Sequence, residues 1–270
     1  MKIYKRAINN QHQLHFAVES ICAKNKIDFQ NIERIFVLKQ SIQKKNKYKL
    51  GRNLKLISVK HDKSKRNYLE RMINQKVHCM KIAKKYEQKY WDGDRKYGYG
   101  GYKYINGYHT VLAKKLIKLY SLNNNSKILD LGCGKGYLLY EIKKILKNIK
   151  IVGVDISKYA IKNSKKEITS QLSYLDLNKK INFEDKSFDL VISIMTLHNL
   201  KIVNLIDRLK DIERIGVSKF ICVESYRNEL EQFNLQCWAL TAETIMDVDA
   251  WKWLFKTSGY TGDYEFIYFK

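Results

Sequence analysis

The chain has 270 residues, of which 45% are hydrophobic, enough for one sizeable α/β domain and a smaller additional segment. Its five cysteines form no CxxC pair and show no metal-ligand spacing, so we expect reduced thiols, no metal site and a cytoplasmic location. The first residues lack the apolar stretch of a signal peptide, and the longest apolar run, 188–197, is too short to cross a bilayer, so we expect no membrane partner.

The formal net charge of +24 is concentrated in the first third of the chain. Residues 1–90 carry 23 Lys and Arg against 6 Asp and Glu, whereas residues 91–270 carry 28 against 21. Such a basic region can bind nucleic acid or another anionic partner. The chain is also crowded with Lys, Asn, Ile and Tyr and has no proline, a mixture that a codon bias toward A and T would produce. We favour this compositional origin and keep nucleic-acid binding as the alternative.

We expect residues 1–63 to form a basic, mainly helical N-terminal extension, and we find no motif in it that predicts a role. A short helix is expected near residues 14–21, and a second apolar segment lies at 32–37. The next part, residues 64–109, begins with Ser64, a suitable N-cap for a helix over 65–89 with apolar residues at helical spacing.

The composition changes abruptly at residues 91–109, WDGDRKYGYGGYKYINGYH, where Tyr and Gly alternate with few aliphatic residues. This pattern favours an ordered loop over a core element. We interpret residues 97–104 as a lid over a ligand, with Tyr99 and Tyr102 stacking on it. A packed surface loop is the alternative.

Residues 110–270 alternate between strand and helix patterns. We expect a Rossmann-like, doubly wound α/β fold: a mostly parallel sheet with helices on both faces and ligands beyond the carboxyl ends of the strands. The expected strands are 127–131, 150–154, 172–175, 188–194, 218–224 and 264–269, and the expected helices are 110–120, 137–147, 158–168, 203–214 and 228–240.

A glycine-rich loop follows the first of these strands. Residues 127–142 read KILDLGCGKGYLLYEI, a buried strand that leads through Gly132, Gly134 and Gly136 into a helix. Glycines are needed where the turn is tight and a nucleotide-like ligand approaches the backbone closely. Asp130 precedes the loop, where a carboxylate can receive a cationic or amine-bearing ligand.

A second acidic residue, Asp155, ends the next strand, 25 residues after Asp130. A carboxylate there can accept hydrogen bonds from both hydroxyls of a ribose. A dinucleotide-binding fold offers the same residue, so this feature alone does not separate NAD from S-adenosylmethionine. Asp176 follows the third strand, and the run Phe188-Asp189-Leu190-Val191 opens a fourth strand that ends near His198.

With LDLGCGKG, VDIS, the LDL segment and SFDLVISIMTLHNL in this order and spacing, the sequence resembles class I S-adenosylmethionine-dependent methyltransferases over residues 107–225. The resemblance implies S-adenosyl-L-methionine as the cofactor. It also implies roles: Asp130, Gly132, Cys133, Gly134 and Gly136 at the methionine part, Asp155 at the ribose, Ile156 against the adenine, Asp176 and Leu177 at the adenine edge, and His198 facing the substrate.

Methyl transfer needs a base only when the acceptor carries a proton to be removed. His198 and Glu224, both expected at strand ends on the ligand side, are the candidates. Each candidate residue also has a purely structural interpretation. His198 can be a hydrogen-bonded core histidine, and Glu224 can be the partner of Arg227. Asp176 can be a turn residue, and the glycines can form a simple strand-to-helix turn.

The favoured function is methylation of a small molecule, and the flanking segments resemble enzymes with a weak association with sugar-related metabolites. The alternative is an RNA or protein methyltransferase that binds its substrate with the basic N-terminal region, and a third candidate is a binding protein that has lost transfer. Without proline the chain cannot carry the Asn/Asp-Pro-Pro-aromatic motif of exocyclic-amine methyltransferases or the Pro-Cys motif of cytosine C5 enzymes. The oligomeric state is not predicted.

Overall fold

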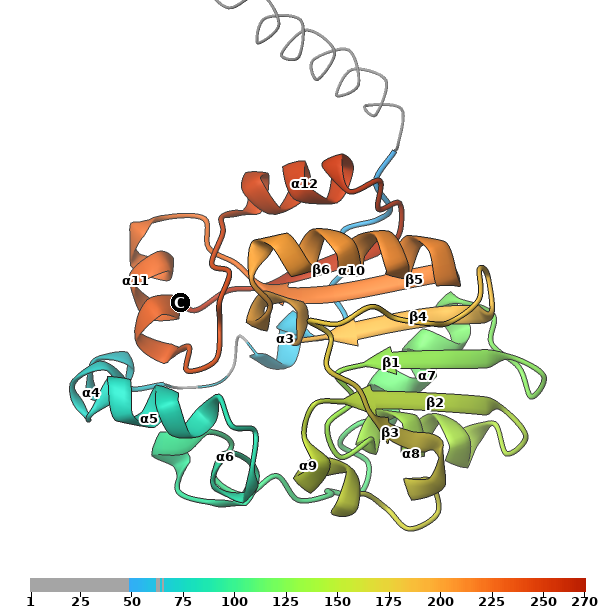
Figure 1. Ribbon diagram of the computed structural model, residues 1–270, viewed down its shortest axis with the longest axis horizontal. Helices are drawn as coiled ribbons and strands as arrows, with labels where there is room; N and C mark the ends of the chain where they lie inside the picture. Colours follow the sequence, from blue (N-terminus) through green and yellow to red (C-terminus); the bar gives the residue numbers. More distant parts are fainter. Residues whose placement is uncertain (1–48, 62–63, 65) are drawn as a thin grey trace, which may run out of the picture. The chain divides into compact units, whose positions relative to one another are not determined.

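The computed structural model describes residues 49–61, 64 and 66–270. These residues belong to one compact unit, which spans residues 48–270. The expected short helix at 14–21 and the apolar segment at 32–37 lie outside the described residues. Figure 1 shows a sheet with helices on both faces, as the sequence predicts.

The six strands form a single sheet in the order β3-β2-β1-β4-β5-β6, and each strand is parallel to its neighbours. From β1 the chain continues to β2 and β3 on one side of β1. It then crosses to β4 on the opposite side of β1, so the strand order reverses between β1 and β4. Ligands of doubly wound folds bind beyond this reversal. The strands are β1 (Lys127–Leu131), β2 (Lys150–Asp155), β3 (Leu172–Tyr174), β4 (Phe188–Ile194), β5 (Gly216–Glu224) and β6 (Asp263–Ile267).

Ten α-helices lie in the described part of the chain, and each is too short or too polar to span a membrane. They are α3 (Ser58–His61), α4 (Tyr68–Ile73), α5 (Lys76–Ala83), α6 (Gln88–Asp92), α7 (Thr110–Leu119), α8 (Tyr137–Ile145), α9 (Lys158–Lys162), α10 (Ile202–Ile215), α11 (Glu229–Trp238) and α12 (Val248–Thr257). Three 3₁₀-helices accompany them: η1 (Arg95–Tyr97), η2 (Thr169–Gln171) and η3 (Leu197–Asn199).

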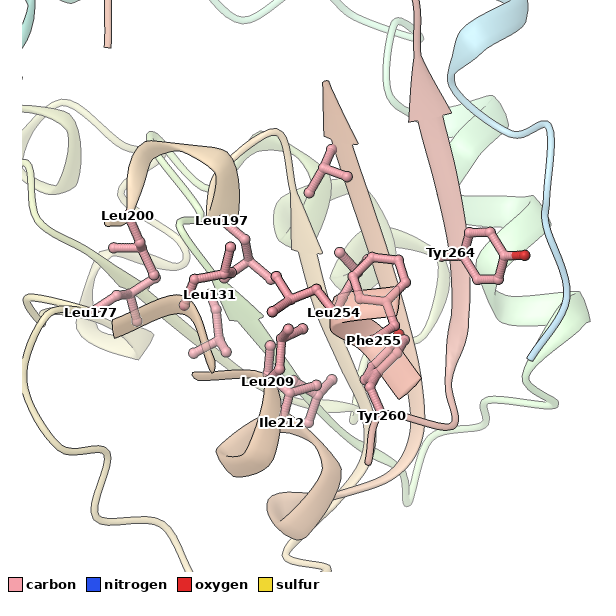
Figure 2. Packing of buried hydrophobic residues seen from close by; sticks show 14 of the residues in the cluster. Leu131, Leu177, Leu197, Leu200, Leu209, Ile212, Leu254, Phe255, Tyr260 and Tyr264 are labelled. Carbon is pink, nitrogen blue, oxygen red and sulfur yellow. The ribbon is translucent and has the colours of Figure 1, made fainter. Parts of the chain in front are cut away.

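Alternating side chains of the strands build one core on each face of the sheet. Leu131 of β1 packs on the face covered by α10 and α12, together with Leu209 and Phe255 (Figure 2). Ile128 of the same strand belongs to the core on the other face, with Leu116 of α7. Because both faces are covered, the strands are apolar almost throughout, as parallel strands usually are.

The prediction of one continuous helix over 65–89 is wrong. The structure has α4, α5 and α6 instead. Asn74 caps the end of α4 and Gln75 adopts the left-handed conformation at φ 48°, while Tyr86, at φ 52°, lies between α5 and α6. The helix expected at 158–168 is also shorter, since α9 ends at Lys162. Helix α12 is not predicted from the sequence; it begins where the Asp247 carboxylate accepts the backbone N–H of Ala250.

The segment before α3 runs along the outer edge of β6. Asn53 forms a parallel bridge with Tyr264, and the Glu265 carboxylate accepts the backbone N–H groups of residues 56–58 at 2.7 to 2.9 Å. The first residues of the described unit therefore cover the edge of the last strand. The boundary expected at 63/64 falls inside this unit.

Candidate active site

The loop between β1 and α8 requires glycine at two positions for different reasons. Gly132 has φ 88°, and a Cβ atom there would lie 2.1 Å from the Thr196 hydroxyl oxygen. Gly136 has φ 68° and immediately precedes α8, so it supplies the left-handed turn that starts the helix. The loop thus lies directly against the end of β4, at the reversal of the strand order.

Asp130 presents a buried carboxyl group beneath this loop. Its side chain is only 5% exposed, and no described residue donates a hydrogen bond to its Oδ1 atom. Burial, and secondarily the negative charge of Asp155, raise the pKa of Asp130 to about 8. A buried carboxyl oxygen without a donor is suited to a cationic or amine-bearing ligand.

Asp155 ties the end of β2 to the glycine loop. Its Oδ2 atom accepts the backbone N–H of Gly134 and its Oδ1 atom accepts the backbone N–H of Ser157, both at 2.7 Å. Burial raises the pKa of Asp155, and these two hydrogen bonds oppose the rise. The next residue, Ile156, is 37% exposed and is available to an apolar ring.

The other expected cofactor residues have local partners. Asp176 accepts two hydrogen bonds from Asn178 at 2.9 Å and so forms a turn. Leu177 belongs to the core, near Leu200 in Figure 2. Burial raises the pKa of the Cys133 thiol, which favours its neutral form. Their expected contacts with the cofactor stay predictions.

An aromatic segment, residues 86–104, packs on the glycine loop. The Trp91 indole N–H donates to the Ser157 hydroxyl at 2.8 Å, and its ring carbon lies 2.8 Å from the Cβ position of Gly134. Tyr99 stacks on Trp91 with a centroid distance of 5.1 Å, and Tyr102 stacks on Tyr137 at 5.3 Å. Both expected lid tyrosines thus contact rings next to the loop.

A buried ion pair holds this segment in place. The Lys135 ammonium, in the glycine loop, lies 2.6 Å from an Asp92 carboxylate oxygen and also donates to the Tyr102 carbonyl at 2.8 Å. Burial alone would raise the pKa of Asp92, but hydrogen bonds from Lys135 and Tyr159 keep it below its usual value. The aromatic segment and the loop are therefore joined by charge as well as by ring packing.

His198 and Glu224 meet at the ends of β4 and β5. The His198 Nε2 atom lies 3.5 Å from a Glu224 carboxylate oxygen, and His198 Nδ1 accepts the Glu224 backbone N–H at 3.4 Å. Burial lowers the pKa of His198, while Glu224 partly offsets this, so the imidazole is neutral at pH 7. Arg227, the alternative partner of Glu224, forms an ion pair with Glu231.

Sequence reasoning missed Trp91, Asp92, Lys135 and Ser157 as parts of this site. Their signals were present: a Trp-Asp pair opens the Tyr/Gly-rich segment, and a lysine interrupts the glycines of the loop. What the sequence did not show is that the two segments meet in space.

The sequence matches a family described as "Methyltransferase domain" over residues 122–259, about half of the chain, and the protein belongs to this family. It is a class I S-adenosylmethionine-dependent methyltransferase. A second match, over residues 47–185, is to the family of protein-L-isoaspartate(D-aspartate) O-methyltransferases.

Curated relatives are similar over a short stretch. The mouse and human proteins named "Arginine-hydroxylase NDUFAF5, mitochondrial" are 36% identical over 70 residues and 34% identical over 82 residues, which is 26% and 30% of this chain. The matched stretches span only 20% and 24% of those proteins.

Solved structures show similarity over about half of the chain or less. The YcgJ protein from Bacillus subtilis is 14% identical with a TM-score of 0.44, covering 56% of this chain and 67% of its own. A SAM-dependent methyltransferase from Aquifex aeolicus is 20% identical with a TM-score of 0.33, covering 38% and 57%.

The residues at the carboxyl edge fit S-adenosyl-L-methionine, which is the cofactor of this enzyme. The strand order is also that of dinucleotide-binding folds, so topology alone does not distinguish the two ligands. The unpaired Asp130 oxygen beneath the glycine loop suits the amino group of a methionine moiety. The family match decides between the ligands.

Proposed function

We propose that this enzyme transfers the methyl group of S-adenosyl-L-methionine to a small-molecule acceptor, related to sugars, bound beside Glu224. The observation that carries the proposal is the aromatic segment packed on the glycine loop, with Trp91 against Gly134 and Asp92 paired with Lys135. A segment that covers the glycine loop in this way favours a compact acceptor and would exclude water from the transfer.

The cofactor would be held by the residues expected from the sequence. Asp130 would accept the amino group of the methionine moiety, beside Gly132, Cys133, Gly134 and Gly136. Asp155 would hold the ribose hydroxyls with lone pairs that its two backbone partners leave available. Ile156 would contact the adenine, with Asp176 and Leu177 at its edge. Tyr99 and Tyr102 would close the site as part of a lid.

When bound, the cofactor supplies an activated methyl group on a positively charged sulfur. The protein aligns the acceptor with it and, where needed, removes a proton. His198 uses Nδ1 to accept the Glu224 backbone N–H, so its Nε2–H points toward the Glu224 carboxylate. Glu224 is therefore the proton acceptor in this proposal, and His198 positions its carboxylate.

The test is an assay of metabolite extracts with isotope-labelled cofactor, followed by mass identification of the labelled product. We expect label in a compound of low molecular mass. Calorimetry with S-adenosylhomocysteine provides the control for cofactor binding. Failure to bind S-adenosylhomocysteine, or label confined to RNA or protein, would overturn the proposal.

A protein or RNA substrate is the second candidate. The match to the isoaspartate methyltransferase family and the basic composition of residues 1–90 favour it. A salt-sensitive gel shift with RNA that disappears when residues 1–47 are deleted would support the RNA form. This truncation retains residues 52–57, which pair with β6. Absent or salt-insensitive binding would count against it.

A further inference from the structure

Four cationic side chains gather around Trp238, at the end of α11. The guanidinium carbons of Arg66, Arg71 and Arg95 lie 5.2, 4.5 and 5.1 Å from the centroid of the Trp238 ring. Lys76 completes this cationic cluster, because its ammonium donates to the carbonyls of the residues on either side of Trp238. Cation–π contacts with one ring thus bring three guanidinium groups together.

No member of the cationic cluster has a carboxylate partner in the part of the chain that the structure describes. Arg71 donates to the carbonyls of Arg95 and Lys96, and Arg95 donates to the carbonyl of Gly98. The Arg71 Nε atom is buried and has no hydrogen-bond partner among the residues that the structure describes. Cations without a carboxylate partner and a buried donor without an acceptor together favour the binding of an anion.

The pKa shifts within the cluster also favour a bound anion. Burial and the neighbouring Arg95 lower the pKa of Arg71, and burial and Arg66 lower that of Arg95. Burial and Arg71 lower the pKa of Lys76 to about 8. A bound anion would relieve this repulsion.

The cluster borders the active site. The Glu224 carboxylate is close enough to Lys76 to oppose the lowering of the lysine pKa. Arg95 lies in η1, inside the aromatic segment, and Arg71 connects α4 to that segment through two carbonyls at 2.8 Å. A group held by the cluster would therefore lie against the segment that closes the site.

We propose that the cationic cluster of Arg66, Arg71, Lys76 and Arg95 binds a phosphate or diphosphate group of the small-molecule methyl acceptor. This inference rests on the proposed function, since it assigns the acceptor class to the same site. Guanidinium groups match phosphate oxygens with paired N–H donors, and four positive charges suit a group with two or more negative ones.

The compactness of the cluster favours a small molecule over a nucleic-acid strand. All three guanidinium carbons lie within 5.2 Å of the centroid of the Trp238 ring, so they surround a single side chain. A strand-binding surface instead distributes its cations along a groove that follows successive phosphates. Cations gathered at one side chain suit one phosphate or two adjacent ones.

The test is calorimetric titration of the full-length protein with inorganic pyrophosphate at pH 7 and low salt. The test variant is Arg66→Gln with Arg95→Gln. The matched control is Lys114→Gln with Lys118→Gln, which removes the same charge from the exposed face of α7. We expect pyrophosphate affinity to fall at least about tenfold in the test variant and to change less than about twofold in the control.

Arg95→Gln alone serves if the double variant loses its circular dichroism spectrum. Equal pyrophosphate affinity in wild type and variant overturns the inference, as does malonate binding as tightly as pyrophosphate. An RNA octamer that binds more tightly than pyrophosphate, and only with the cluster intact, overturns the small-molecule assignment. S-adenosylhomocysteine binding without pyrophosphate binding refutes this inference alone, whereas failure to bind S-adenosylhomocysteine refutes the proposed function.

Discussion

Binding of S-adenosylhomocysteine should release a proton from Asp130 near neutral pH. Burial raises the pKa of this carboxyl to about 8, so at pH 7 roughly nine molecules in ten carry the proton there. A ligand ammonium group next to the carboxyl favours the charged form and lowers that pKa. Binding at pH 7 should therefore release about 0.9 proton for each ligand bound.

The sign of the pH dependence follows from the same shift. Below pH 8 the free protein must lose a proton before the carboxylate can pair with the ligand, so affinity should rise with pH between 6 and 8. The slope should approach about tenfold per pH unit at the acid end and flatten near pH 8.

Calorimetry in buffers with different ionisation enthalpies, such as Pipes and imidazole at pH 7, measures this proton directly. The Asp130→Asn variant removes the titrating group while keeping its shape, so it should bind more weakly and release no proton. The reasoning would be refuted by wild-type binding without proton release, or by equal release in the Asp130→Asn variant.

Three further outcomes are expected. Asp155→Ala should weaken S-adenosylhomocysteine binding at least about 30-fold, because the glycine loop loses two buried hydrogen bonds and the ribose its acceptor; unchanged affinity in calorimetry would mean that the ribose is held elsewhere. His198→Ala should leave that affinity unchanged but lower turnover and alter its pH profile, and wild-type turnover would remove it from the mechanism. Asp92→Ala should cost about 2–3 kcal/mol in urea denaturation, because the buried Lys135 ammonium loses its carboxylate partner and keeps only the Tyr102 carbonyl. The control Asp94→Ala, at an exposed pair, should cost at most about 0.5 kcal/mol, and equal losses would show that the buried pair does not hold the aromatic segment.

Much of the sheet could be predicted from the sequence because parallel strands are buried on both faces. Runs such as Phe188–Ile194 are therefore mostly apolar, with Asp189 at an exposed position, and stand out from their surroundings. The glycine loop and Asp155 were predictable for a related reason, since they follow buried strands at fixed positions.

The helical region before the sheet was harder to predict. Apolar residues at helical spacing over 65–89 do not reveal that Gln75 adopts a positive φ, because packing decides this. Likewise, the contact of Trp91 with Gly134 and the gathering of arginines around Trp238 depend on the tertiary fold. A single sequence shows which residues carry chemistry but not which distant segments meet.

The pairing of residues 52–58 with β6 also affects how the protein is made. The Glu265 carboxylate that holds residues 56–58 lies 207 to 209 positions after them in the chain. During synthesis the early segment therefore leaves the ribosome long before its partner exists. A nascent chain that stops before Glu265 would lack the native partner of that segment, so this edge of the sheet forms only after β6 has been made.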